Sequence, residues 1–456
     1  MNVTEDGDRG RRELRASALV GWPTYDSHVQ LLRSGGDRNR GLILIAVGLA
    51  LTIAVGALLR WQIWPSGVPS LSDGALSGVF DPQQLSDDRG YRRGLEIMAW
   101  IGVPLAPVVA IAVAATATRW RDRVLQLARG RVALAGALLG AALAGLTALV
   151  ALPLAAARYA WIRDHGVGRQ PLDSWLIDRL EGAAIQMVIL AIAVAVVAAS
   201  VHYLRRSWWL ALGALVTLLA VGLTLLSPVL ISPRFEQTRP LDNPALERDI
   251  RELADRAGVE VDEIVVTDAS RRTRAFNARV EGLGATQRVV LSDTLMQGAP
   301  PAELRWVVAH ELAHAKEGHL VKGVAWIAAL AVPLALLVFG ATGAMAGFAR
   351  DEHGRARAEA SLTRTAVALA VITTLTAISA PLSNTVSRAY EAEADWIALQ
   401  LTGDPQAAID FRVRTRERRR GAVDPPALIQ LWFGTHPTSS QRVGLAQRFE
   451  KELGGS

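Results

Sequence analysis

Seven long apolar segments constrain the fold of this chain more than any other feature. Each is close to the about 20 residues that a helix needs to cross a bilayer. Hydrophobic residues make up 51% of the 456-residue sequence and mean hydropathy is +0.24, values typical of multispanning membrane proteins. We therefore predict a mainly α protein with seven transmembrane helices, at 42–59, 97–116, 132–155, 183–201, 208–231, 324–348 and 365–382.

Charge and cysteine content narrow the function classes. The net charge of +6 comes from arginines spread over loops and tails beside the apolar segments, which indicates a membrane protein with no nucleic-acid partner. The absence of cysteine excludes disulfides, thiolate zinc ligands and a cysteine nucleophile. Because no small-residue cleavage site is evident, we interpret the first apolar segment as a retained span rather than a signal peptide.

One short motif indicates the chemistry, since residues 310–314 read HELAH. His310 and His314 lie four residues apart and project from one face of a helix, where two neutral imidazoles can bind one zinc ion. Glu311 beside them is a carboxylate that can take a proton from the attacking water, as in a zinc peptidase. A buried helix with a pair of satisfied histidines is the structural alternative.

The last two spans place a second motif on the same side of the membrane. HELAH precedes the sixth apolar segment and YEAEAD (390–395) follows the seventh, so the chain crosses the membrane twice between them. If these spans pack as an antiparallel hairpin, the helix before one and the helix after the other emerge side by side. We therefore expect Glu391 to lie near the histidines.

The candidates for a third metal ligand are His319, Glu391 and His436. On a straight helix His319 points about 180° away from His310, so we expect it to cap or pack the helix. Glu391 and Asp395 share a helix face, where one can bind zinc while the other holds a ligand imidazole through its free N–H. Glu393 points elsewhere and is expected to be solvated.

The apolar segments also divide the polar parts of the chain. After the fifth segment we predict a surface helix at 244–257, then strands at 263–268, 275–282 and 287–293. This indicates a small α+β zinc metallopeptidase domain inserted between the fifth and sixth spans and completed by C-terminal helices. The expected parts are a polar Arg-rich tail (1–40), a five-span membrane domain (41–231), the metallopeptidase part with HELAH (232–323), the sixth and seventh spans (324–382) and the C-terminal part of the metallopeptidase domain (383–456).

Longer motifs resemble a known family. They are HELAHAKEGH, SRAYEAEAD, FNARVEG followed by RVVLSDTL, ISPRFEQTRPL after the fifth span and HGVGRQPLDSWLIDRL before the fourth. With them the chain, from about residue 95 to about residue 445, resembles the type I CAAX prenyl endopeptidases, integral-membrane zinc metallopeptidases of the gluzincin group.

The resemblance implies roles for the residues around YEAEAD. In the family the Glu that opens an ExxxD motif is the third zinc ligand, and it corresponds to Glu391. The Asp of that motif, here Asp395, supports the ligands from behind. Arg388 is the expected structural partner of these carboxylates. One zinc ion per chain, held by His310, His314 and Glu391, is thus implied.

Two further elements of the family have counterparts here. The HPxxxxR element supplies His436, which can donate a hydrogen bond to the oxyanion, and Arg442, which is expected to support the site. Asn277 and Ala278 match a strand beside the cleft, to which a peptide could add as a further strand. A loop histidine before a proline and an asparagine at a turn are the structural alternatives.

Together these features predict a zinc-dependent endopeptidase that cleaves peptide or protein substrates, including membrane-associated ones, at the lipid bilayer. One alternative is a heat-shock-type membrane metalloprotease of quality control, although the seven spans and PRFEQTRPL favour the prenyl-protease-like group. The other is a non-catalytic membrane scaffold or transporter, which would need a missing catalytic residue, and none is missing. The sequence makes no prediction of the oligomeric state.

The location follows from composition and resemblance. Among the 49 basic residues only Lys316, Lys322 and Lys451 are lysine, a bias that fits a GC-rich bacterial genome and favours a bacterial cell membrane. Arg and Lys are nearly equal on the two faces, so the positive-inside rule does not choose an orientation. The resemblance implies an N-terminus outside and a metallopeptidase domain in the cytoplasm.

Overall fold

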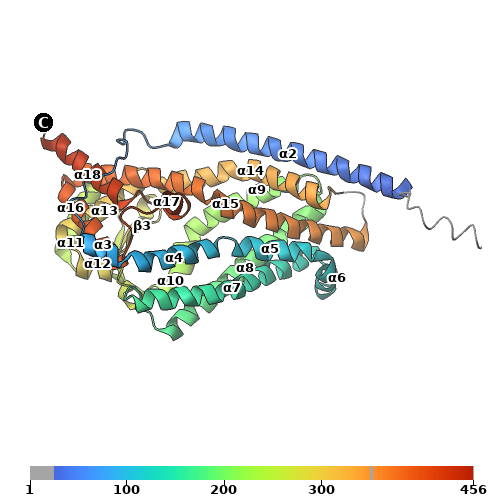
Figure 1. Ribbon diagram of the computed structural model, residues 1–456, viewed down its shortest axis with the longest axis horizontal. Coiled ribbons are helices and arrows are strands. Elements are labelled where there is room, and N and C mark those ends of the chain that lie inside the picture. Colours follow the sequence, from blue (N-terminus) through green and yellow to red (C-terminus); the bar gives the residue numbers. More distant parts are fainter. Residues whose placement is uncertain (1–24, 350–352, 455–456) are drawn as a thin grey trace, which may run out of the picture.

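The structure, a computed structural model, describes residues 25–349 and 353–454, and most of them are helical (Figure 1). Within these residues seven helical segments are long and apolar enough to cross a membrane, which confirms the seven predicted spans. They are α2 (Tyr25–Ile63), α4 (Arg89–Gly102) continued by α5 (Leu105–Ala115), α7 (Val132–Asp164), α8 (Leu172–Leu204), α9 (Trp208–Leu226), α14 (His319–Ala346) and α15 (Gly354–Thr402).

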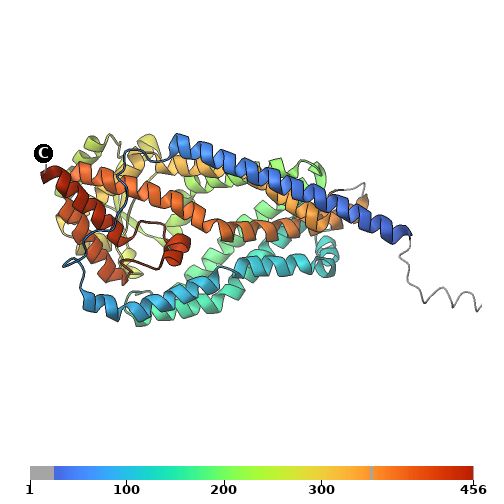
Figure 2. The same cartoon turned by 45° about the horizontal axis from the view of Figure 1, so that its top comes forward.

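The long helices expose apolar side chains along their length. Ile53 on α2, Leu149 on α7 and Val188 on α8 are each more than half exposed. A surface of this kind is unfavourable in water but matches the hydrocarbon of a bilayer. α2 packs along α14 at the outside of the bundle (Figure 1, Figure 2).

Close packing of α7 against α8 depends on glycine. A Cβ added at Gly140 would overlap the carbonyl oxygen of Leu190, and one added at Gly136 would overlap the side chain of Ala198. Small residues let the backbones of two membrane helices approach closely, which gains van der Waals contact where no hydrophobic effect drives association. These positions therefore fix how α7 and α8 meet.

The shorter helices gather toward one end of the bundle, except α6 (Ala117–Leu127), which lies at the other end (Figure 1). The predicted surface helix is confirmed as α11 (Pro244–Ala257), where Asn243 Oδ1 accepts from the Leu246 N–H at 3.1 Å and Gly258 ends the helix with a φ of 72°. The others are α3 (Pro82–Asp87), α10 (Ser232–Phe235), α12 (Asp293–Gly298), α13 (Pro301–Lys316), α16 (Pro405–Arg419), α17 (Ala427–Phe433) and α18 (Ser439–Gly454).

A small sheet lies beside α13. Its order is β1-β2-β4-β3, with β2 (Glu263–Thr267) and β4 (Arg288–Ser292) parallel in the centre. β1 (Thr238–Pro240) and β3 (Ala278–Glu281) pair antiparallel at the two edges. The three predicted strands are present, although the middle one is shorter than expected, and β1 was not predicted.

One hydrophobic core joins this sheet to the C-terminal helices. Val289 and Leu291 of β4 are fully buried against α11, α13 and the end of α15. Val443 of α18 belongs to the same cluster, so segments on both sides of the last two spans stabilise one unit. The exact limits of the predicted domains remain predictions.

Two helices carry the motifs out of the membrane in different ways. α13 ends at Lys316, and Gly318 takes a φ of 63°, a left-handed conformation that favours glycine, before α14 begins at His319. In contrast, α15 continues without a break from its membrane span through YEAEAD (Figure 2). Because α13 packs against α15, the two motifs face each other.

Candidate metal centre

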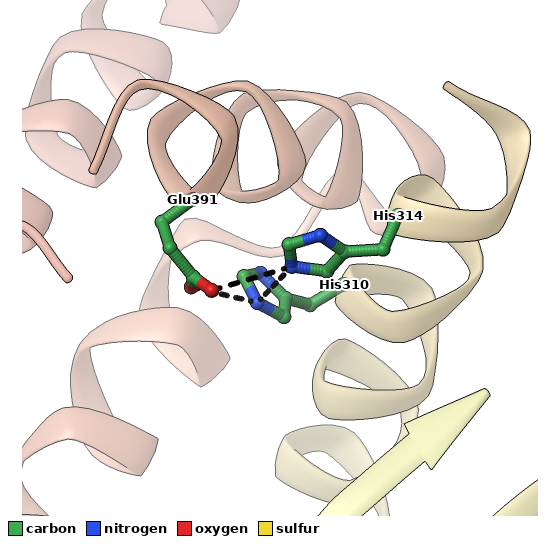
Figure 3. Close-up of side chains that lie close together, drawn as sticks. All are labelled: His310, His314 and Glu391. Carbon is green, nitrogen blue, oxygen red and sulfur yellow. Dashed lines mark hydrogen bonds and ion pairs between the residues drawn. The ribbon is translucent and has the colours of Figure 1, made fainter. Parts of the chain in front are cut away.

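Three side chains from two helices meet at one point (Figure 3). His310 and His314 project from α13, and Glu391 projects from α15. The Nε2 atoms of the two histidines are 3.2 Å apart. Glu391 Oε2 lies 3.3 Å from His310 Nε2, and Glu391 Oε1 lies 3.6 Å from His314 Nε2. One ligand atom from each residue lies within 4.8 Å of the other two, so the group could hold a metal ion.

The chemistry of these atoms fits a metal ion. Within the described residues, Glu391 Oε2 is buried and accepts no hydrogen bond, although His310 Nε2 and His436 Nε2 each lie 3.3 Å from it. A cation bound between these atoms would satisfy the carboxylate oxygen. Two facing imidazole nitrogens present lone pairs to the same point. Two nitrogens and one carboxylate oxygen form a donor set of catalytic zinc sites, which keep a fourth position open.

A buried carboxylate supports His310 from behind. Asp395 Oδ1 lies 3.0 Å from His310 Nδ1, and Arg442 of α18 donates to the same oxygen. Asp395 is 3% exposed and Arg442 is 8% exposed. Burial alone would lower the pKa of His310, but Asp395 and Glu391 raise it to about 9. A metal ion that binds His310 at neutral pH therefore displaces a proton.

Glu311 lies on α13 directly after His310. Burial raises the pKa of its carboxyl to about 7, and the nearby charge of His310 opposes this shift. A carboxyl group with a pKa close to the working pH can accept and return a proton at low cost. Glu311 thus has the properties of a general base.

His436 approaches the site from the segment between α17 and α18. Its Nε2 lies 3.3 Å from Glu391 Oε2, and its side chain is 54% exposed, so an incoming molecule can reach it. The expected partnership of Arg388 with the carboxylates is wrong. Its guanidinium instead donates to the carbonyls of Gln430 at 3.1 Å and Gly434 at 2.7 Å, because α17 lies beside α15 there. Arg388 thereby holds the segment that carries His436.

The strand expected to bind substrate lies at an edge of the sheet. Asn277 exchanges bonds with Ser292, its N–H donating to the hydroxyl at 3.0 Å and its carbonyl accepting from the backbone N–H at 2.9 Å. Ala278 pairs with Leu291 in β4. Among the described residues no strand pairs with the other side of β3, which lies next to α13. Within the described residues β3 is thus an edge strand with one unpaired side.

Two residues near the centre lie where a straight helix would not place them or where solvent was expected. Glu393 was expected to be solvated, but it is 6% exposed, and its Oε2 lies 2.8 Å from His319 Nε2. His319 was expected to cap or pack the helix, and its ring does stack on Tyr390. A straight helix would have directed it away from His310 and His314, but its Nδ1 lies 2.8 Å from His314 Nδ1. The turn at Gly318 explains the difference, since the angle held only for a straight helix. A HELAH motif followed closely by glycine and histidine was the available signal.

Comparison with known proteins agrees with this geometry. Residues 240–449 match the profile of peptidase family M48. Residues 97–237 match the CAAX prenyl protease N-terminal profile, which describes five membrane helices. The chain belongs to peptidase family M48. As an M48 peptidase with seven membrane-spanning helices, it is a multi-pass membrane metallopeptidase and a hydrolase.

One relative and one solved structure cover most of this M48 peptidase, and a second relative covers a shorter part. The uncharacterized metalloprotease YhfN of Bacillus subtilis is 27% identical over 424 residues, which are 89% of this chain and 97% of YhfN. CAAX prenyl protease 1 of Saccharomyces cerevisiae is 41% identical over 98 residues, 21% of this chain and 22% of that protein. The crystal structure of S. mikatae Ste24p superposes with a TM-score of 0.63 at 20% identity, covering 89% of this chain and 98% of Ste24p, and shows a shared fold.

Proposed function

We propose that this M48 peptidase is a zinc-dependent endopeptidase with one zinc ion held by His310, His314 and Glu391. The observation that carries the proposal is the convergence of these three side chains on one point from two helices. Within the described residues Glu391 Oε2 is buried and accepts no hydrogen bond, and the sequence has no cysteine; both support zinc in a nitrogen and oxygen site.

Zinc would supply a Lewis acid that polarises the substrate carbonyl and acidifies the attacking water. Glu311 takes a proton from that water as it attacks the peptide carbonyl and then passes the proton to the departing amine. The pKa of about 7 for Glu311 suits both transfers near neutral pH. Asp395 Oδ1, 3.0 Å from His310 Nδ1, would keep the imidazole proton on Nδ1 and so leave the Nε2 lone pair for the metal.

His436 is proposed to stabilise the developing oxyanion. Its Nε2 faces the metal ligands and its side chain is exposed, so it can donate a hydrogen bond to the carbonyl oxygen of a bound peptide. The bonds of Arg388 to Gln430 and Gly434 would keep the His436 segment in place.

The substrate is proposed to be a peptide segment that adds to the free edge of β3. Ala278, the first residue of β3, lies where an added strand would start, beside the helix that carries HELAH. The backbone N–H and carbonyl of Asn277 bond Ser292, so Asn277 would contact the peptide through its side chain. The bilayer around the seven spans makes membrane-associated proteins the natural substrate class. The match to the five-helix N-terminal profile favours the prenyl-protease-like group over the heat-shock-type proteases.

For the location, we infer a bacterial cell membrane with the metal centre on the cytoplasmic side. The scarcity of lysine supports a bacterial source. The orientation is taken over from the family that the chain resembles.

The test separates metal binding from catalysis. Glu311→Gln protein, purified in detergent, is expected to keep one zinc per chain by elemental analysis and to lose cleavage of casein or of a farnesylated peptide. Glu252→Gln, an exposed change on α11, is the control and should retain both properties. Cleavage by Glu311→Gln at the native rate would overturn the assignment of the general base.

A further inference from the structure

The two ligand histidines are supported in different ways on the sides that face away from the metal. His310 Nδ1 meets a carboxylate directly, at 3.0 Å from Asp395 Oδ1. His314 Nδ1 instead meets another imidazole, at 2.8 Å from His319 Nδ1. The far nitrogen of that imidazole, His319 Nε2, lies 2.8 Å from Glu393 Oε2. Two successive contacts, His314 to His319 and His319 to Glu393, thus connect a proposed metal ligand to a buried carboxylate.

The two residues beyond His314, His319 and Glu393, are both buried. His319 and Glu393 are each 6% exposed. The ring of His319 stacks on Tyr390, with centroids 4.5 Å apart and planes 13° apart. Lys322 Nζ lies 4.0 Å from Glu393 Oε2. Few rotamers are open to an imidazole that is stacked on one face and bonded at both nitrogens, so His319 presents a fixed edge to His314.

The direction of each hydrogen bond follows from the proposed metal site. Because His314 Nε2 faces Glu391 and would give its lone pair to the metal, its proton must be on Nδ1. That N–H can donate to His319 only if His319 Nδ1 is unprotonated. His319 then carries its own proton on Nε2 and donates it to Glu393. Each N–H donor in the series His314, His319 and Glu393 then has an acceptor, and with the metal on His314 Nε2 only this arrangement of protons achieves it.

We propose that His319 and Glu393 are positioning residues that hold His314 in the tautomer and orientation needed to bind the metal. The proposal rests on the proposed metal site. The three acids of YEAEAD then have separate roles. Glu391 binds the metal, Asp395 contacts Nδ1 of His310, and Glu393 acts on His314 through His319. Glu393 is about 200° around α15 from Glu391 and so needs His319 as a bridge. The turn at Gly318 places that bridge.

The decisive measurement is zinc affinity, by competition with a chromophoric chelator on the full-length protein in detergent. His319→Phe keeps the stacking on Tyr390 but removes both nitrogens, and it is expected to weaken zinc binding roughly 10- to 100-fold. His319→Asn returns an acceptor near the position of Nδ1 and should recover part of that loss. Glu393→Gln keeps an acceptor for His319 but removes the charge, so a smaller loss is expected.

A spectroscopic readout separates positioning from general stability. The visible absorption of Co²⁺ bound at the site reports ligand geometry, and we expect His319→Phe to change it. Tyr390→Phe is the matched control, because it removes the hydroxyl that accepts from Trp326 at 3.0 Å but keeps the ring on His319. It should leave zinc affinity and the Co²⁺ spectrum unchanged.

The outcomes distinguish this inference from the proposed function. Native zinc affinity in His319→Phe overturns the positioning role while the metal site stands. Equal losses in His319→Phe and His319→Asn also overturn it, because the acceptor would then not matter. If His319→Phe does not fold, native affinity in Glu393→Gln and in His319→Asn together overturns it. Absence of zinc from the native protein would instead refute the proposed function.

Discussion

Asp395 Oδ1 lies 3.0 Å from His310 Nδ1, although two membrane spans separate these residues in the sequence. Arg442 of α18 donates to the same oxygen, so the C-terminal helix also contributes to the metal centre. Three separate stretches of the chain thus have to be folded together before His310 has its support.

Removing the guanidinium of Arg442 from the buried carboxylate of Asp395 should lower the stability of the protein. Arg442→Met leaves Asp395 buried without its guanidinium, and we expect a loss of about 3 kcal/mol or more in stability together with weaker zinc binding. Thermal unfolding in detergent and a zinc titration measure both effects. Arg448→Met on the same helix breaks an exposed pair with Glu452 and should change neither. Equal behaviour of the two variants would show that the buried contact is unimportant.

Loss of a ligand should remove the metal. His310→Ala is expected to lower bound zinc from one ion per chain to a small fraction, because a nitrogen and an oxygen from the remaining ligands hold zinc weakly. Elemental analysis after dialysis measures this. His353→Ala, at the opposite end of α15 from the metal centre, should keep its zinc. Full occupancy in His310→Ala would place the metal elsewhere.

Zinc affinity should rise with pH between about 6 and 9. Without zinc the pKa of His310 is about 9, so below that pH its imidazole is mostly protonated and cannot bind. The pKa of His314 is lowered to about 3 by burial and the neighbouring His310, so it is already neutral. We therefore expect roughly a tenfold gain in affinity per pH unit. Competition titrations, corrected for protonation of the chelator, measure this slope, and a flat profile would contradict it.

The contact between α7 and α8 should not tolerate a larger residue. Gly140→Ala places a methyl group against the carbonyl of Leu190, and we expect it to destabilise the protein by about 1–3 kcal/mol. Gly145→Ala on the same helix would meet only Met187, at an ordinary 3.6 Å, and is the control. Thermal unfolding in detergent compares the two, and equal stability would argue against this packing.

The proposed orientation can be tested without the substrate. A reporter fused after Ser456 should be active only if it is a type that works in the cytoplasm. A periplasmically active enzyme fused at the same position should stay silent. The reverse pattern would place the metal centre outside the cell.

The spans and α11 could be predicted because their signals are local. Length and hydropathy identify a membrane helix, and Asn243 with Gly258 marks both ends of α11. β1 was not predicted because it is only three residues long and ends in proline, and its pairing with β2 is a tertiary contact.

The meeting of HELAH with YEAEAD was expected from topology alone, and the structure brings His310, His314 and Glu391 together as expected. Their binding of a metal remains a prediction. The two wrong expectations, for Glu393 and Arg388, concern which residues of other segments pack against α15. Helix periodicity gives the direction in which Glu393 points, but only the fold shows that His319 fills that space. The expectation for Arg388 was wrong for the same reason, because the segment after α17 offers it a carbonyl acceptor at Gly434.

Because α15 is unbroken, its length sets the distance between the predicted end of the seventh span and the metal centre. From Leu382, where the span predicted from the sequence ends, α15 rises roughly 14 Å to Glu391 at about 1.5 Å per residue. An extended chain covers that height in about four residues. For a lipid boundary at Leu382, we therefore expect a bond that is cut to lie at least that far along its own chain from the point where it leaves the lipid, because a shorter segment would not reach the metal centre.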